Sequence, residues 1–140
     1  MKHWIYPANP KYYDVISAFT QNNKTPWPMS SKVEIGDMIY IYSGNPLKQI
    51  LFKCKVLEIG LSSEQVISYV EEYIKVQGKS PKKSFMMLKT IESFGVDNAG
   101  PLCFSALKLN GLKGSIMGPQ CLENNIELFD YIKSIDKQEG

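Results

Sequence analysis

The chain opens with a strand-forming segment that prolines interrupt within a few residues. Residues 4–6, Trp-Ile-Tyr, favour β structure, and Pro7 follows them directly. Asn9 is a favourable helix N-cap, and Pro10 suits the first helical position because its φ angle is already close to the helical value. A strand that ends at a capped helix leaves backbone N–H groups directed at open space. The opening therefore predicts a strand, a helix and a candidate ligand position between them.

Two periodicities organise the rest of the chain. Apolar positions alternate over residues 49–59, which is typical of a half-buried strand. Ser62 and Gln65 form a capping box ahead of an apolar helix face, and Asn124 with Glu127 is a similar start for a last helix. Strands are expected at residues 4–6, 38–42, 49–59 and 84–94, and helices at 12–19, at 62–74 and from 124 onward. These elements predict an α+β fold, a small curved mixed sheet or open barrel with peripheral helices.

Composition limits the class of protein. Hydrophobic residues make up 44% of the 140 positions, which is enough for a single domain over 1–140 to bury its own core. No apolar run approaches the ~18 residues that a membrane span needs, and the opening lacks a signal-peptide pattern. A soluble cytoplasmic protein without a membrane partner is therefore expected. Cys54, Cys103 and Cys121 are widely spaced and favour reduced packing residues over a disulfide or metal site.

The residues that most enzymes need are scarce. His3 is the only histidine, which excludes histidine triads and multi-histidine metal clusters. The sequence has no Walker loop, no GxGxxG after a strand and no G-x-S-x-G. We therefore expect no catalytic residue, no metal and no cofactor. The scattered carboxylates Asp14, Asp37 and Glu58 leave a small metal-dependent nuclease or hydrolase as an alternative.

Lysine supplies all 16 basic residues, and arginine is absent. Lysine contacts phosphate as a point charge and cannot make the bidentate contacts that arginine makes to phosphate or guanine. The net charge of +2 is too small to indicate nucleic-acid binding by itself. Lys75, Lys79, Lys82, Lys83 and Lys89 cluster without an intervening acid, a pattern that fits either phosphate contacts or a solvated loop.

Several short motifs follow one another in an order that resembles the EVE domain, a member of the PUA-like superfamily related to the YTH and ASCH domains. The motifs are Pro7-Ala8-Asn9-Pro10 at the end of the first strand, Trp27 in the loop after the first helix, Gly36-Asp37 before the next strand, and Phe85 to Leu88 in a later strand. A weaker likeness continues through residues 101–104 and 118–120, so that only residues 61–83 lie outside it. The resemblance implies a PUA-like fold and a non-catalytic nucleic-acid-binding module.

The resemblance also implies a pocket between the end of the first strand and the loop after the first helix. Such a pocket takes a flipped base and stacks it on aromatic side chains, which contributes ~1–3 kcal/mol per base against an extrusion cost of a few kcal/mol. The expected pocket residues are Tyr6, Asn9, Trp27, Pro28, Met29, Tyr42 and Met86, and the expected phosphate contacts are Lys11, Lys79, Lys82 and Lys83. Trp27 has an equally strong alternative as a buried loop anchor.

The chain departs from the family directly after Trp27, where Pro28 and Met29 replace the Gly and the Arg or Asn of many EVE domains. The identity of the base is therefore open. The expected ligand is a nucleic acid with a modified base, DNA being favoured because EVE relatives are linked to restriction and defence, and a separate nuclease or effector protein is a further expected partner. The alternatives are an RNA-binding PUA-like module in RNA modification or translation, the nuclease or hydrolase, and a protein-interaction scaffold.

Overall fold

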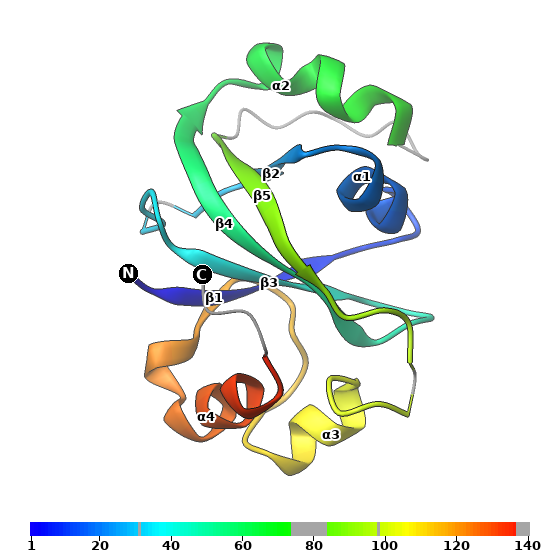
Figure 1. Ribbon diagram of the computed structural model, residues 1–140, viewed down its shortest axis with the longest axis vertical. Helices are drawn as coiled ribbons and strands as arrows, with labels where there is room; N and C mark the ends of the chain where they lie inside the picture. The colour runs from blue at the N-terminus through cyan, green and yellow to red at the C-terminus, as the bar shows by residue number, and fades with distance from the viewer. Residues whose placement is uncertain (31, 74–83, 98, 137–140) are drawn as a thin grey trace.

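The computed structural model describes residues 1–30, 32–73, 84–97 and 99–136 (Figure 1). The strands are β1 (His3–Ala8), β2 (Lys24–Pro28), β3 (Met38–Ser43), β4 (Gln49–Leu61), β5 (Phe85–Ser93) and β6 (Gln120–Cys121). The helices are α1 (Val15–Gln21), α2 (Ser63–Val70), α3 (Phe104–Leu109) and α4 (Ile126–Ile135), with short 3-10 turns η1 (Glu71–Tyr73) and η2 (Leu122–Asn124). Among these described segments, no helix combines the length and the hydropathy that crossing a membrane requires.

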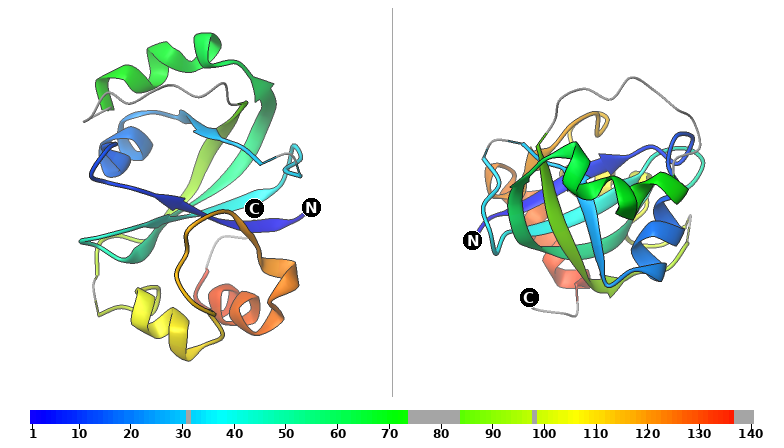
Figure 2. Two further views of the ribbon diagram at one scale, coloured as in Figure 1. Left: turned by 180° about the vertical axis from the view of Figure 1, so that it is seen from behind. Right: turned by 90° about the horizontal axis from the view of Figure 1, so that it is seen from above.

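The strands form one mixed, open sheet in the order β2-β5-β4-β3-β1-β6. β1 runs parallel to β3, and the other neighbouring pairs are antiparallel. The edges, β2 and β6, do not pair with one another, and β6 pairs with β1 only at Trp4 and Ile5. Tyr6 to Ala8 of β1 therefore have no strand partner on that side within the described chain. Figure 2 shows the strongly twisted sheet that results.

Alternation along the strands directs side chains to two separate cores, one on each face of the sheet. Within β1, Trp4 and Tyr6 belong to the first-face core, and Ile5 belongs to the second-face core. The first-face core includes α1 and is rich in aromatic rings: Trp4, Tyr6, Phe19, Trp27, Phe52 and Tyr73. The second-face core is covered by α3 and α4 and is mostly aliphatic: Ile5, Ile50, Leu102, Leu107, Leu112, Ile116, Leu122, Leu128 and Ile132 with Tyr40, Tyr42 and Phe129 (Figure 1).

An ion pair fastens the end of α4 to the sheet. Lys53 Nζ of β4 lies 2.6 Å from Asp136 Oδ2, and Tyr40 Oη donates to the same oxygen at 2.6 Å. The Lys53 side chain is only 4% exposed. A carboxylate at the end of a helix distant in the sequence compensates the burial of its ammonium group.

Two predicted helix starts lie a few residues from the observed ones. The first helix begins at Val15, where Asp14 Oδ1 accepts from Ser17 N at 3.3 Å, and not at Pro10. Asn9 instead starts a turn. The last helix is capped by Asn125 and not by Asn124, which belongs to η2. Asp14 lies five positions after Asn9, and Asn125 directly follows Asn124, so each stretch offers two capping residues close together.

Candidate functional site

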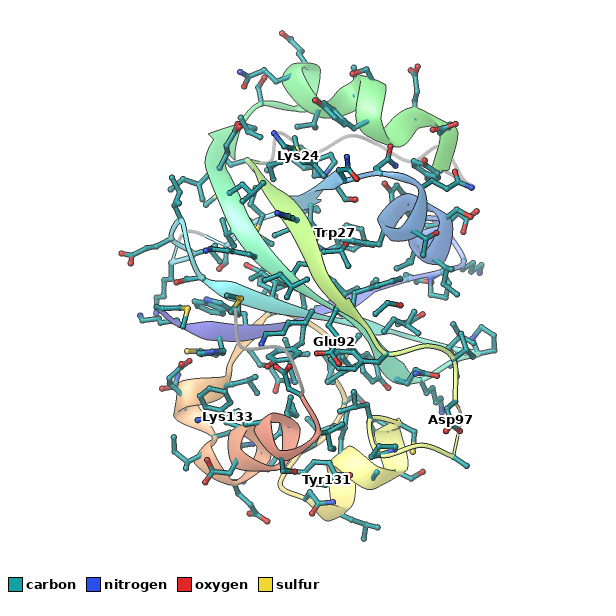
Figure 3. All side chains as sticks on the ribbon, viewed as in Figure 1. Lys24, Trp27, Glu92, Asp97, Tyr131 and Lys133 are labelled. Carbon is teal, nitrogen blue, oxygen red and sulfur yellow. The ribbon has the colours of Figure 1, made fainter. Side chains whose placement is uncertain are left out.

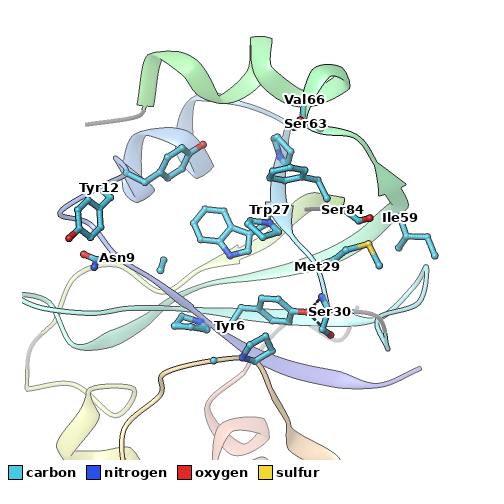
Figure 4. A pocket seen from close by; sticks show the side chains of 18 of the residues that line it. Tyr6, Asn9, Tyr12, Trp27, Met29, Ser30, Ile59, Ser63, Val66 and Ser84 are labelled. Atoms are coloured by element: carbon cyan, nitrogen blue, oxygen red, sulfur yellow. Dashed lines mark hydrogen bonds between the residues drawn. The ribbon is translucent and has the colours of Figure 1, made fainter. Parts of the chain in front are cut away.

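A cavity of about 1010 Å³ lies in the seam between β1 and the edge strand β2, and it is here named the seam cavity. Figure 4 shows α2 on one side of the cavity and β1 on the other. The lining comes from six parts of the chain: Tyr6–Asn9, Tyr12–Tyr13, Pro26–Ser30, Ile59–Gly60 with Ser63, Val66 and Ile67, Ser84–Phe85, and Met117–Pro119. The cavity is at the upper end of the volumes typical of ligand pockets, and its lining is mostly apolar.

Trp27 forms the wall that joins the seam cavity to the first-face core. The sequence places this residue in a loop, but it lies within β2, opposite Met86 of β5. Its ring packs edge-on against Tyr13 at 5.4 Å and tilted against Phe19 at 5.5 Å, measured between ring centroids. Trp27 is 9% exposed and lines the seam cavity (Figure 4). The ring is therefore both an anchor of the core and a wall of the cavity.

Tyr6 and Ser30 lie opposite α2 and are held by a pair of hydrogen bonds. Tyr6 Oη donates to Ser30 Oγ at 3.0 Å and accepts from Ser30 N at 2.9 Å (Figure 4). Burial raises the pKa of Tyr6, and the bonds to Ser30 only partly offset that effect. The phenol therefore stays neutral at physiological pH, and it fixes the chain after β2 against β1.

Asn9 and Tyr12 lie at the mouth of the seam cavity and are exposed. Asn9 Oδ1 accepts from Lys11 N at 3.0 Å, so the carboxamide oxygen is used within the turn. The amide nitrogen of Asn9 has no hydrogen-bond partner among the described residues, and it remains free to donate. Lys11 Nζ lies 5.6 Å from the centroid of the Tyr12 ring, which puts one ammonium group at this mouth.

Tyr13 carries an unusual hydroxyl group. Its oxygen is buried and has no hydrogen-bond partner, the one such side-chain atom in the part of the chain that the structure describes. Burial is the main reason that the pKa of Tyr13 lies far above its ordinary value, and the neighbouring Tyr73 and Asp14 add to it. Tyr13 also lines the seam cavity.

Five of the seven sequence-predicted pocket residues line one cavity: Tyr6, Asn9, Trp27, Pro28 and Met29. Tyr42 does not line it, because its ring belongs to the second-face core. Met86 does not line it either, because its side chain is fully buried. Of the predicted phosphate contacts, Lys11 lies beside the mouth, and Lys79, Lys82 and Lys83 lie outside the described residues.

Several lining residues were not among those that the sequence predicted. Val66 and Ile67 come from α2, and Met117 to Pro119 come from the loop before β6. The apolar face of α2 was visible in the sequence, but nothing local indicates that it covers this cavity. Met117 is 90% exposed and reaches the cavity from a loop that no local sequence pattern connects with it.

The seam cavity is electrically neutral. Among its described lining residues there is no Asp, Glu, Lys or His. Within the described ranges, no three His, Cys, Asp or Glu side chains are grouped so that they could hold a metal ion. Asp37 is buried and accepts from Lys2 N, Glu34 N and Trp4 Nε1 at 3.0, 3.0 and 3.1 Å. The described lining therefore offers apolar and uncharged polar groups to a ligand.

Comparison with known proteins gives structural neighbours only. The sequence matches no protein-family model and no curated protein. Among solved structures, the chain is similar to ASCH from Zymomonas mobilis, with a TM-score of 0.66, 12% identity, and coverage of 98% of this chain and 97% of that one. It is also similar to the DUF55 domain of human thymocyte nuclear protein 1, with a TM-score of 0.62, 15% identity, and coverage of 98% and 99%.

A hypothetical protein from Leishmania major is a further neighbour, with a TM-score of 0.63, 13% identity, and coverage of 96% and 94%. These similarities extend over nearly the whole of each chain and concern the fold. The fold class expected from the sequence, an α+β PUA-like open sheet with peripheral helices, is therefore confirmed.

Proposed function

We propose that this chain is a non-catalytic nucleic-acid-binding module of the EVE type, which takes a modified base, flipped out of its strand, into the seam cavity. The observation that carries the proposal is a neutral, mostly apolar cavity with an indole wall and an exposed amide donor at its mouth. A base is flat, uncharged and polar at its edge. Its faces can stack on the indole wall, and its edge can accept a hydrogen bond from the amide donor.

The position of Trp27 supports stacking within the cavity. Its ring is held by Tyr13 and Phe19, so little conformational entropy remains to be lost when a base packs on it. The free amide group of Asn9 supplies a donor for a base edge. A methyl group on the base would add on the order of 0.8 kcal/mol when buried against the apolar wall.

The neutrality of the lining supports a binding role over a hydrolytic one. A carboxylate nuclease needs acidic groups that hold a metal beside the scissile phosphate. Asp14 caps α1, and the Asp37 carboxylate accepts three hydrogen bonds. Glu58 is an exposed residue of β4 that does not line the seam cavity. The three carboxylates that left the nuclease alternative open are thus either engaged elsewhere or outside the cavity.

The EVE assignment rests on the sequence motifs, and the fold shared with the DUF55 domain of human thymocyte nuclear protein 1 supports it. The preference for DNA rests only on the link of EVE relatives to restriction and defence. In this proposal the module supplies recognition, and a separate nuclease or effector protein acts on the marked site. RNA is the competing polymer, because the seam cavity by itself has no feature that excludes a 2′-hydroxyl group.

The test is a fluorescence-anisotropy titration with DNA and RNA oligonucleotides, single- and double-stranded, that carry methylcytosine, hydroxymethylcytosine, methyladenine or no modification. Tyr12→Ala and Tyr69→Ala form a matched pair of variants, because both rings are exposed, at 47% and 42%, and only Tyr12 lines the seam cavity. We expect a preference for one modified DNA that weakens in Tyr12→Ala and is unchanged in Tyr69→Ala.

Other outcomes would revise or overturn the proposal. Preference for a single-stranded RNA would replace DNA by RNA as the ligand. Equal, weak and salt-sensitive binding of every oligonucleotide would contradict base reading, because only lysine charge would then be acting. Strand cleavage that requires added Mg²⁺ would contradict the non-catalytic role.

A further inference from the structure

Three lysines form a continuous row across three neighbouring strands. Lys24 of β2 lies directly opposite Lys89 of β5, and Lys89 lies directly opposite Lys55 of β4. Directly opposed residues of antiparallel strands point to the same face of a sheet, so the three ammonium groups share one surface. Figure 2 shows these three strands side by side. This set is named the lysine row.

The positive charges of the lysine row are not paired with carboxylates of the described residues. No ion pair joins Lys24, Lys55 or Lys89 to a carboxylate of the described residues. Glu92 and Glu58 lie on β5 and β4 to either side of the row, where they oppose Lys53 and Met87. Like charges that face one another across strands reduce stability, so the folded protein carries a repulsion that an anion would relieve.

The row begins close to the seam cavity. Pro26 lines the cavity and is the next residue of β2 on the same face as Lys24. Two residues of strand cover about 7 Å, and each further strand adds about 5 Å. The positive charge therefore starts beside the cavity and runs away from it across the sheet. Figure 3 labels Lys24 and Trp27, which lie three residues apart on β2 and point to opposite faces of the sheet.

We infer that the lysine row holds the sugar–phosphate backbone of the same nucleic-acid strand whose base enters the seam cavity. This inference rests on the proposed function and adds the path of the backbone and the residues that neutralise it. A row of ammonium groups a few ångströms apart matches a chain of phosphates, and it carries no sequence information because lysine acts as a point charge. The cavity reads the base, and the row supplies affinity that is independent of sequence.

The inference predicts two opposite effects of one substitution. Lys89 is the central member, so Lys89→Gln removes both cross-strand repulsions and one phosphate contact. We expect its Tm to rise by about 1 to 4 °C at low salt, with a smaller rise at high salt. We expect its affinity for any oligonucleotide to fall about two- to five-fold at low salt.

The experiment measures binding over a range of salt concentrations for the wild type, Lys89→Gln, the triple variant of Lys24, Lys55 and Lys89 to Gln, and Lys108→Gln. Lys108 is an exposed lysine of α3, a helix that covers the second-face core, and it serves as the matched control. Each phosphate contact contributes about 0.7 to the slope of log affinity against log salt on a single strand. We expect the triple variant to lower that slope by about 2, the control to leave it unchanged, and the base preference to survive in both.

Each result separates the inference from the proposed function. If the wild type discriminates between bases, and the row variants keep the affinity and salt slope of Lys108→Gln, the lysine row is not the backbone site and the cavity stands. If the row variants lose the base preference itself, the division between cavity and row is wrong. If the wild type binds no oligonucleotide, the proposed function fails and the inference fails with it.

Discussion

The two faces of the sheet are built by the same strands and differ in how they are closed. The second-face core is covered by α3 and α4, and its aliphatic side chains pack around Leu107, Leu128 and Ile132, all fully buried. The first-face core is covered by the seven-residue α1 and by β2, an edge strand of five residues. Large aromatic rings fill that core, and a cavity remains where the sheet edges do not meet.

This difference teaches that one face stabilises the fold while the other carries the candidate site. Aromatic rings suit the first face because they fill space as rigid units and can also present a flat surface to a ligand. Aliphatic side chains interdigitate closely and leave less room for a ligand. Substitutions within the second-face core should change stability alone, and substitutions around the seam cavity should change stability and binding together.

The largest expected effect comes from Trp27→Ala, because Trp27 belongs to both the core and the cavity. Removing the indole should lower the free energy of unfolding by about 3–5 kcal/mol and abolish any base preference. Urea denaturation and the anisotropy titration, at a temperature where circular dichroism shows a folded variant, measure the two effects. A large loss of stability with the base preference intact would make Trp27 an anchor only.

Leu107→Ala tests the second face. Leu107 is the fully buried residue of α3, and its truncation should cost about 2–5 kcal/mol with no change in base preference. Leu109, two residues later on the same helix and 84% exposed, is the matched control, and Leu109→Ala should stay within about 0.5 kcal/mol of the wild type. A change in base preference in folded Leu107→Ala would show that the two faces are coupled.

Asp37 gives a smaller effect that depends on pH. Burial tends to raise the pKa of Asp37, but hydrogen bonds from Lys2 N, Glu34 N and Trp4 Nε1 outweigh it and hold that pKa below its ordinary value of 3.8. A carboxyl group whose pKa is lower in the native than in the unfolded protein stabilises the fold at pH values above its unfolded-state pKa. This stabilisation is lost as the pH falls through the native pKa. The free energy of unfolding should therefore decrease as pH falls below about 4.

Asp37→Asn should cost about 1–3 kcal/mol at pH 7, because an amide group would direct a donor at one of the three donors that now meet the carboxylate. Its free energy of unfolding should also depend less on pH below about 4 than that of the wild type. Urea denaturation at a series of pH values measures both. An identical acid dependence in variant and wild type would assign that dependence to another group.

The smallest effect is expected for Ser30→Ala, which removes one hydrogen bond to Tyr6 at the edge of the seam cavity. The expected cost is about 0.5–1.5 kcal/mol, together with a modest loss of affinity as Tyr6 becomes less fixed. Ser115→Ala, at an exposed serine that does not line the cavity, is the control and should change neither quantity. If Ser30→Ala and Ser115→Ala had the same stability and affinity, Tyr6 would not be part of the binding site.

Much of the fold could be predicted from local patterns. The long strand at 49–59 and the strand at 84–94 were expected nearly where β4 and β5 lie, and the Ser62 capping box starts α2 as expected. These predictions succeed because periodicity and capping depend on residues a few positions apart. The helix starts at Asn9 and Asn124 failed because two capping residues stood close together and local energetics did not separate them.

The candidate site was predictable only in part. The sequence by itself determined the elements that carry the chemistry: the strand before Asn9, the Trp27 segment, and a chain with one histidine and no arginine. The tertiary structure decided which of these residues meet. The register of β1 with β3 directs Tyr6 toward the seam cavity and Tyr42 away from it, and distant segments supply Val66 and Met117. Pairing register and the position of an open sheet edge depend on contacts between residues far apart in the chain, and local sequence preferences cannot encode them.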